Sequence, residues 1–396
     1  MATPSLAMIP SGYKSGKVYS VLPTDGTGDL TFTRASSATR VNQSGLIELV
    51  ATGVPRLDYT GGGCPSLLLE PQSTNLLTYS EAFDNAYWNK SLSSIVLNSL
   101  TSPSGLVDAS KLIEDSSNSD HRIFNGTGLT LSGTVSFSVF IKKGERNFIK
   151  LTNNNLTGVY FDLNNGVIGT IDSGFTAKIE NYSNGWYKCS MSATAAANER
   201  FIVYTSVDGI TTTYQGDGTS GIYIYGAQLE QQSYATSYIP TSGPTVTRIE
   251  DTASKTGLSN YIDSTSGVFE VNISALSNNQ TFRSISISNG TTSNTIIIRY
   301  SDITQQIQFL VIIGGVIVYF HGETVADITV STKCKLKWDL ANFGAKINDV
   351  EVDSQLSGAV FAANTLTKVG FTEGTTTFKF EGNVGNLKVY KGITSY

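Results

Sequence analysis

The chain offers few residues that could perform acid–base or nucleophilic chemistry. Its two histidines, His121 and His321, lie far apart in the sequence and in different expected domains. A catalytic triad needs a histidine, an orienting carboxylate and a nucleophile on a sharp turn, and no Gly-x-Ser-x-Gly run is present. No His/Cys spacing fits zinc. We therefore expect packed or solvated histidines, no metal site and no catalytic residues.

Carboxylate pairs raise the hypothesis of glycoside hydrolysis, for which the candidates are Glu114–Asp115, Glu250–Asp251 and Glu230. Hydrolysis needs two carboxyl groups about 5–9.5 Å apart on either side of the scissile bond. Neighbouring residues of a strand point to opposite faces, so an adjacent pair would need a loop. No solenoid period typical of long polysaccharide-cleaving proteins is visible. A polysaccharide depolymerase is therefore the weakest of our functional hypotheses, and the expectation is a protein that is not an enzyme.

One polar loop combines residue types suited to binding a sugar. Tyr214, Gln215 and Asp217 lie together in it, and tyrosine is an amphipathic contact residue. Amide and carboxylate groups hydrogen-bond sugar hydroxyls, and loops often contain binding residues. We predict Tyr214, Gln215 and Asp217 as carbohydrate contacts. Ordinary turn structure is the alternative, and Asp208 with Asp217 leaves calcium as an unproven alternative, because calcium takes six to eight oxygens.

Composition predicts an all-β chain. Only 15% of residues are charged, while Gly occurs 38 times and Tyr 19 times. Such residues suit turns and strands better than helices.

The net charge of −5 comes with no basic cluster, so nucleic acid is not an expected partner. The apolar run 309–313 is too short to cross a bilayer, so no membrane insertion is expected. The start lacks a secretory signal pattern, and three widely spaced cysteines, Cys64, Cys189 and Cys334, suggest free thiols made in a reducing cytosol.

The pattern of strands and turns predicts three regions. Residues 1–80 contain turn signals and an expected hairpin that pairs Leu30–Arg34 with Leu46–Val50 around a turn at 42–45. Residues 81–243 and 244–396 each show short strands separated by turns, which is typical of a β-sandwich or jelly roll. The Asn164–Gly166 turn is among the clearest hairpin signals. Trp186 and Trp338 lie within strand patterns and are expected in the core. Residues 240–244, with two prolines, form the expected linker.

A resemblance to a known class of proteins comes from residues 28–90. Arg34, Arg40, Pro55, Arg56, Asp58, Tyr59, Glu70, Pro71, Gln72 and Asn75 match the opening block of tailed-bacteriophage tail fibres, adhesins and head decorations. Region 81–243 resembles carbohydrate-binding-module-like jelly rolls of such proteins, through Asn184–Tyr187, Gly221–Glu230 and Ser237–Thr241. Region 244–396 resembles concanavalin-A-like or laminin-G-like sandwiches. The implied fold is an N-terminal β-hairpin adaptor followed by two antiparallel β-sandwiches.

The resemblance also implies a setting. It suggests a virion protein, made in the host cytoplasm, that binds other virion proteins, forms a homo-oligomer such as a trimer, and adheres to a host cell-surface glycan without catalysis. Arg34, Arg40, Arg56 and Asp58 are then expected at an assembly or docking surface, or as a brace of the hairpin. The alternative is a purely architectural virion component without a ligand. No cofactor is expected.

Overall fold

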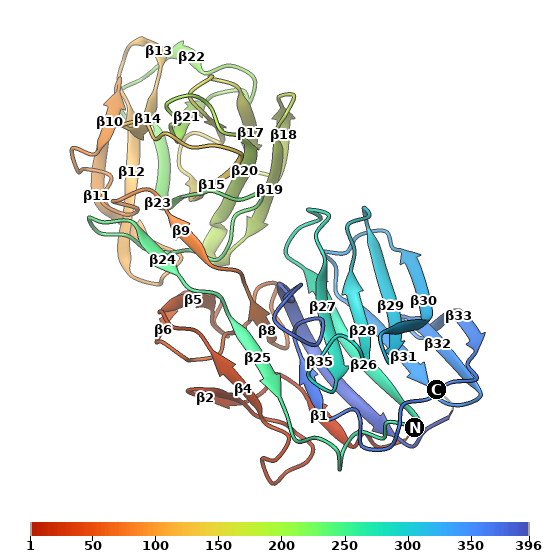
Figure 1. The fold of residues 1–396 in the computed structure, drawn as a ribbon. Coiled ribbons are helices and arrows are strands. Elements are labelled where there is room, and N and C mark those ends of the chain that lie inside the picture. Colours follow the sequence, from red (N-terminus) through yellow and green to blue (C-terminus); the bar gives the residue numbers. More distant parts are fainter. Residues whose placement is uncertain (1, 395–396) are drawn as a thin grey trace.

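The computed structural model describes residues 2–394, and in this range it is almost entirely β-structure. It has 35 strands and one 3-10 helix, η1 (Ser183–Gly185). The strands form two lobes, shown one above the other in Figure 1. We call residues 76–242 the inserted lobe, and residues 2–75 together with 243–394 the base lobe. The predicted all-β fold of antiparallel sandwiches is confirmed.

Two large sheets form the base lobe. The β26 sheet has the order β33-β32-β31-β26-β35-β8-β7, with β1 also paired to β35, and the β28 sheet has the order β2-β3-β4-β25-β34-β27-β28-β29-β30. The strands of the β26 sheet are β1 (Leu6–Met8), β7 (Leu57–Asp58), β8 (Ser66–Leu69), β26 (Gly267–Ala275), β31 (Thr332–Trp338), β32 (Asn342–Ile347), β33 (Val350–Leu356) and β35 (Gly382–Lys391). Those of the β28 sheet are β2 (Tyr13–Lys14), β3 (Lys17–Val18), β4 (Leu30–Thr33), β25 (Thr252–Lys255), β27 (Arg283–Ser288), β28 (Thr295–Tyr300), β29 (Gln306–Ile313), β30 (Val316–Thr324) and β34 (Lys368–Gly370).

The inserted lobe is a second sandwich of two six-stranded sheets. The β16 sheet has the order β10-β14-β21-β16-β17-β18, and the β15 sheet has the order β11-β12-β23-β15-β20-β19. The strands of the β16 sheet are β10 (Trp88–Ser91), β14 (Arg122–Asn125), β16 (Phe148–Thr152), β17 (Gly158–Asp162), β18 (Val167–Ile171) and β21 (Ile202–Ser206). Those of the β15 sheet are β11 (Ser93–Thr101), β12 (Val107–Glu114), β15 (Thr134–Lys143), β19 (Thr176–Asn181), β20 (Tyr187–Thr194) and β23 (Gly221–Glu230). A small pair, β13 (Asn118–Asp120) with β22 (Thr213–Gln215), lies at one end.

Local sequence explains several of these elements. Gly166 has a positive φ of 66° in the turn that joins β17 to β18, where the Asn164–Gly166 signal predicted a hairpin. Strand residues that alternate inward fill one large core in each lobe, as period-two side-chain placement requires. A smaller buried cluster packs Ile47 of the base lobe against inserted-lobe residues that include Trp186. Trp186 and Trp338 are 0% and 1% exposed, so their predicted core positions are confirmed.

The first region differs from its expected form. β4 joins the nine-stranded β28 sheet, and the partner of β6 (Ile47–Val50) is β5 (Ala38–Val41). Residues 6–69 contribute Leu6, Phe32 and Leu67 to the same core as the C-terminal strands. The adaptor expected at residues 1–80 is therefore part of the C-terminal sandwich, because its short strands have too little apolar surface to form a core of their own.

The inserted lobe is attached through two strands that pair with each other. β9 (Ser73–Asn75) leads into this lobe and β24 (Val246–Arg248) leads out of it, and the two form an antiparallel ribbon. Both strands lie side by side between the lobes in Figure 1. The proline-containing segment expected as a linker is also fixed, since Gly243 N donates to Thr78 O and Thr241 Oγ1 donates to Leu77 O. The lobes are thus joined by a paired connection.

Within residues 2–394 there is no helix with the length and apolar character needed to cross a membrane.

Candidate functional site

The tyrosine of the predicted sugar-binding loop is buried. Tyr214 is 7% exposed, and its hydroxyl donates to Glu114 Oε2 at 2.7 Å and contacts Thr205 Oγ1 at 2.6 Å. Its ring lies 4.9 Å from the His121 ring and 5.2 Å from the Arg146 guanidinium. Burial and the neighbouring Glu114 raise the pKa of Tyr214. With both the ring and the hydroxyl engaged, Tyr214 cannot offer a stacking face, and this prediction is wrong.

The other two residues of this loop are exposed but serve the turn. Gln215 Nε2 donates to Ser116 O at 2.5 Å. Ser220 Oγ donates to Asp217 Oδ2, and the backbone N–H groups of Ser220 and Thr219 donate to Asp217 Oδ1; these hydrogen bonds lower the pKa of Asp217. The structure therefore gives Gln215 and Asp217 a turn-forming role, while a sugar contact at either residue stays a prediction.

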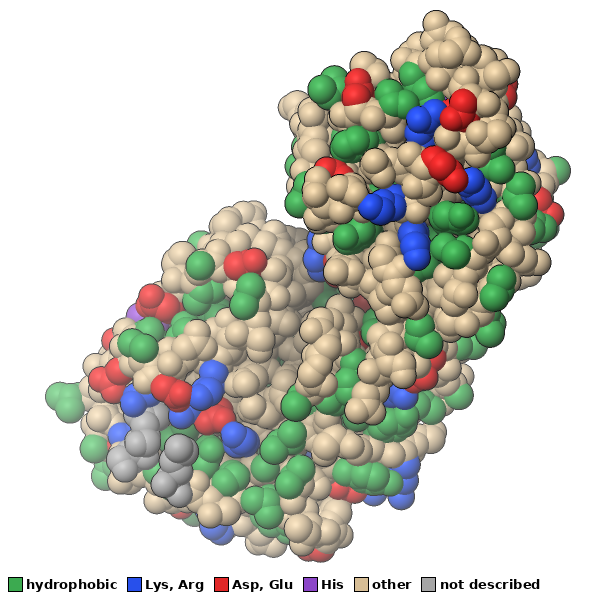
Figure 2. Space-filling view, turned by 180° about the vertical axis from the view of Figure 1, so that it is seen from behind, with side chains coloured by type: hydrophobic (Ala, Val, Ile, Leu, Met, Phe, Trp, Pro, Cys, Tyr) green, Lys and Arg blue, Asp and Glu red, His purple; other side chains and the backbone are tan. Residues whose placement is uncertain are grey.

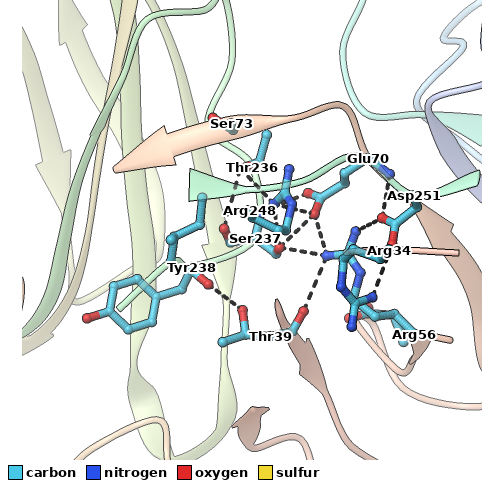
Figure 3. Close-up of polar contacts among 12 residues, drawn as sticks. Arg34, Thr39, Arg56, Glu70, Ser73, Thr236, Ser237, Tyr238, Arg248 and Asp251 are labelled. Carbon is cyan, nitrogen blue, oxygen red and sulfur yellow. Dashed lines mark hydrogen bonds and ion pairs between the residues drawn. The ribbon is translucent and has the colours of Figure 1, made fainter. Parts of the chain in front are cut away.

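Two of the four predicted docking residues lie in a buried ion network between the lobes (Figure 3). Arg34 Nη1 lies 3.1 Å from Asp251 Oδ1, and Arg56 pairs with Asp251 and Glu70. The side chains of Arg34 and Arg56 are fully buried. Buried side chains cannot form a docking surface, so the alternative role, a structural brace, fits Arg34 and Arg56. They brace the junction between the lobes and not only a hairpin.

The network also binds the segment that leaves the inserted lobe. Arg248 Nη1 lies 2.7 Å from Glu70 Oε2, and Ser237 N donates to Glu70 Oε1 at 2.7 Å. Although burial alone would raise the pKa of Glu70, Arg248, Arg56 and the Ser237 hydrogen bonds lower it well below its usual value. Because an unpaired buried charge is costly, separation of these partners would be strongly unfavourable.

Arg40 and Asp58 brace the N-terminal segment nearby. Arg40 Nε lies 2.6 Å from Glu48 Oε1, and Arg40 Nη2 donates to the Tyr13 hydroxyl at 2.8 Å. Asp58 Oδ2 accepts from Val41 N at 2.8 Å, and Asp58 is 7% exposed. In this structure the side chains of Arg40 and Asp58 contact other residues of the N-terminal segment. They act as a brace within the chain and not in the predicted docking role.

A candidate site that the sequence did not single out lies on the outer face of the β16 sheet. Arg122 of β14 is directly opposite Tyr204 of β21, Tyr204 is opposite Lys150 of β16, and Lys150 is opposite Tyr160 of β17. We call Arg122, Tyr204, Lys150 and Tyr160 the cation–tyrosine row. The alternate residues of these strands, such as Ile123 and Val203, fill the core, so the row faces away from it.

Cations in this row lie against aromatic rings. The Arg122 guanidinium is 5.3 Å from the Tyr204 ring centre, and Arg122 Nη1 donates to the Tyr204 hydroxyl at 2.7 Å. Lys150 Nζ is 5.1 Å from the Tyr160 ring centre. The rings are largely covered, with Tyr204 3% and Tyr160 8% exposed, whereas the Arg122 side chain is 29% exposed. The tyrosines therefore support the cations and hold them in place at the surface.

The next row adds an aromatic residue between two arginines. Phe124 lies one position beyond Arg122 on the same face, with Arg122 5.7 Å and Arg200 5.3 Å from its ring centre. The Nε atoms of Arg122 and Arg200 have no hydrogen-bond partner within the described residues. Both Nε atoms are buried, so a ligand would meet the outer part of the Arg122 guanidinium, whose side chain is 29% exposed, and not these two atoms.

Carboxylates border the row on both sides. Asp120 lies 4.0 Å from Arg122 Nη1, and Asp172 lies 3.7 Å from Lys150 Nζ. Burial, followed by the nearby Asp208, Asp172 and Asp120, raises the pKa of Tyr160. Donors and acceptors therefore alternate along the face, which suits a ligand whose hydroxyls both donate and accept.

The sequence contained a signal for this face that we did not use. Arg122 and Phe124, Phe148 and Lys150, and Tyr160 alternate with core residues along short segments of the sequence. Each strand supplies one or two polar or aromatic outward residues, and only the strand order brings them into a row. That order places β14 next to β21, about 80 positions later in the chain, which a local pattern does not reveal.

The carboxylate pairs weighed for hydrolysis are engaged elsewhere. Glu114 pairs with Arg146, Glu250 pairs with Lys379 at 2.6 Å, and Asp251 belongs to the junction network. Glu230 is buried and accepts a hydrogen bond from Ser73 Oγ at 2.5 Å. The two histidines lie in different lobes, His121 buried beside Tyr214 and His321 3.0 Å from Glu323. Among residues 2–394, no three His, Cys, Asp or Glu side chains cluster as a metal site would require.

Comparison with known proteins gives distant structural similarities. No protein-family model and no curated protein matches the chain. The Ruminococcus gnavus IT-sialidase CBM40 bound to α2,3-sialyllactose aligns at 18% identity and a TM-score of 0.29, covering 33% of this chain and 78% of that chain. The laminin α1 chain of mouse, domains LG4-5, aligns at 12% identity and a TM-score of 0.25, covering 69% of this chain and 86% of that chain. These likenesses are too distant to support a function, and the site above is built on the geometry of this chain alone.

Proposed function

We propose that the protein is a non-catalytic glycan-binding component of a tailed-phage particle, and that the outer face of the β16 sheet binds the glycan. The observation behind this proposal is the cation–tyrosine row. Its charged groups are held by aromatic rings and bordered by carboxylates, so donors and acceptors alternate on a firm sheet surface. A sugar ring presents hydroxyls of both kinds at similar spacing.

The mode of contact follows from exposure. Since the Tyr204 and Tyr160 rings are mostly covered, the sugar would meet the Arg122 and Lys150 nitrogens first, and Phe124 would offer the apolar contact. Hydrogen bonds to charged groups contribute about 1.5–3 kcal/mol each. A site of this kind is individually weak, and repetition of the protein on a particle would multiply its effect.

Placement on a phage particle rests on the resemblance of residues 28–90 to virion proteins. The structure gives those residues an internal bracing role, so the particle contact would be made by other surfaces. Incorporation into virions together with failure to bind any host surface would favour the architectural alternative.

The test is a glycan array probed with the purified full chain and three variants. Lys150→Ala and Arg122→Ala should weaken binding about tenfold or more, because each removes a charged hydrogen-bond donor. Lys111→Ala is the matched control, since Lys111 lies 5.9 Å from the Tyr223 ring on the other sheet of the same lobe. Equal binding by wild type, Lys150→Ala and Arg122→Ala would contradict the assignment of this face.

A further inference from the structure

A cleft separates the two lobes on the side opposite the cation–tyrosine row. Its volume is about 680 Å³, and residues of both lobes line it. A second hollow of about 550 Å³ adjoins it, and the two share Lys178, Ala235, Leu276 and Thr329. Figure 2 shows the molecule hollowed between the lobes. Small-ligand sites have volumes of this order, about 300–1,000 Å³.

The cleft is walled by the outward faces of two sheets. Lys178 of β19 and Lys188 of β20 come from the β15 sheet, whereas Asn272 of β26 and Asn386 of β35 come from the β26 sheet. Their neighbours Cys189 and Val271 fill the two cores, so these four side chains point outward from their sheets. Glu70 and Ser237 of the junction network also line the cleft.

The charged groups of the inserted-lobe wall are already satisfied. Lys178 Nζ lies 2.8 Å from Glu180 Oε1, and Lys188 Nζ donates to Thr236 O at 2.5 Å. An ionic ligand would have to compete with these partners. The cleft therefore favours an uncharged occupant.

The opposite wall has amides with unused capacity. Asn272 and Asn386 are direct partners across β26 and β35, and the Oδ1 atoms of both lack a hydrogen-bond partner within residues 2–394. Arg40 Nη1, which also belongs to a cleft-lining residue, lacks one too. These three atoms are buried at the cleft wall, and a buried polar atom without a partner costs about 1–3 kcal/mol. A turn of the side chain that brings the atom to the cleft surface would let a ligand hydroxyl or a water recover that cost.

We propose that this cleft is a second binding site, separate from the β16 face, for a short neutral oligosaccharide. Hydroxyls and carboxamides dominate its lining, including Thr39, Ser66, Ser274, Ser331 and Asn383. Once the amides are turned so that their oxygens face the cleft, sugar hydroxyls can donate to Asn272 and Asn386, and they can also accept from serine and threonine hydroxyls. An extended peptide would instead add to the free backbone groups of an edge strand such as β19, whereas β26 and β35 of the opposite wall are paired on both sides.

The thiol of Cys64 can report whether the cleft is occupied. Cys64 lines the cleft and is exposed, whereas Cys189 and Cys334 are fully buried, and burial raises the pKa of both buried thiols. A maleimide should therefore label Cys64 of the native full chain selectively. The labelling rate, read by mass spectrometry, is measured with neutral trisaccharides of glucose, galactose and N-acetylglucosamine.

We expect at least one trisaccharide to slow Cys64 labelling severalfold and saturably. The Asn272→Ala/Asn386→Ala double variant should lose that protection while keeping the wild-type labelling rate without sugar and the wild-type thermal midpoint. Lys150→Ala on the β16 face should keep the protection, which separates failure of this site from failure of the proposed function. Unchanged labelling with every trisaccharide, protection that survives in the double variant, or protection by a pool of extended peptides alone would each overturn the proposal.

Discussion

Arg56 is the residue on which the junction between the lobes depends most. It is fully buried and pairs with both Glu70 and Asp251. Arg56→Ala would leave two buried carboxylates short of a counter-charge, so we expect a loss of about 3–5 kcal/mol in the free energy of unfolding. Urea unfolding followed by tryptophan fluorescence measures it. Lys178→Ala, which breaks an ion pair whose lysine is 57% exposed, should cost less than about 1 kcal/mol.

Glu70 should make stability sensitive to acid. Its pKa is lower in the folded protein than in the unfolded chain, so it stabilises the fold above the ordinary glutamate pKa of about 4.3, and this contribution is lost as the pH falls below that value. The thermal midpoint of the wild type should therefore drop between pH 5 and pH 3. Glu70→Gln should be less stable at pH 7 and should show a shallower acid dependence. An equal fall of the thermal midpoint between pH 5 and pH 3 in the wild type and Glu70→Gln would contradict this role.

The residue types of the junction could be read from the sequence, but their partners could not. Arg34 and Arg56 stood out as a motif, whereas Asp251 follows Arg56 by 195 positions. Charged residues of a recognisable motif look like a surface because most charges are exposed. Burial of these arginines became visible only when the fold brought Glu70, Arg248 and Asp251 around them.

At the scale of single strands, β17 must approach β16 closely for the cation–tyrosine row to form. A Cβ atom added at Gly158 would collide with the backbone carbonyl oxygen of Leu151 on β16. Gly158→Ala should therefore shift β17, lower the thermal midpoint and weaken glycan binding. Gly221→Ala meets the carbonyl of Leu112 in the other sheet in the same way, and should lower the midpoint without weakening binding through the row. Equal loss of binding in both variants would indicate a general folding defect.

The positions of the strands could be predicted from the sequence, whereas the pairing of the strands could be predicted only in part. The Asn164–Gly166 hairpin followed from local turn chemistry. The turn expected at 42–45 and the return strand at 46–50 are confirmed, but the partner of the return strand is β5 and not residues 30–34. Residues 30–34 form β4, which has a long-range partner, β25, about 220 positions away. Long-range pairing depends on packing of the whole sandwich, which a window of sequence does not contain.

The whole molecule consists of one sandwich inserted into another. This arrangement predicts that a fragment containing the inserted lobe folds alone and that a C-terminal fragment does not. Residues 76–242 have their own core, and their ends are joined by an isolated bridge between Tyr79 and Ser242. This fragment should fold alone with a cooperative thermal transition. Residues 244–396 lack β1, β4, β7 and β8 and should be largely unfolded by circular dichroism. A cooperative transition in that fragment would contradict the shared core.

This plan explains why the expected boundaries at residues 80 and 243 were informative but incomplete. They lie close to the ends of the inserted lobe. They did not show that the segments before and after it form one body, because β1 meets β35 only across some 380 positions. The two sandwiches were therefore visible in the sequence, and the insertion was not.

The pairing of β1 with β35 determines how the protein responds to mechanical force. Leu6 lies opposite Val389 in antiparallel register, so the first and last strands meet at their outer ends (Figure 1). Tension applied through residues before Leu6 and after Lys391 would peel these two strands apart one hydrogen bond at a time. That load does not pass through β9 or β24. The inserted lobe would therefore stay folded and unstretched while its anchoring body is pulled.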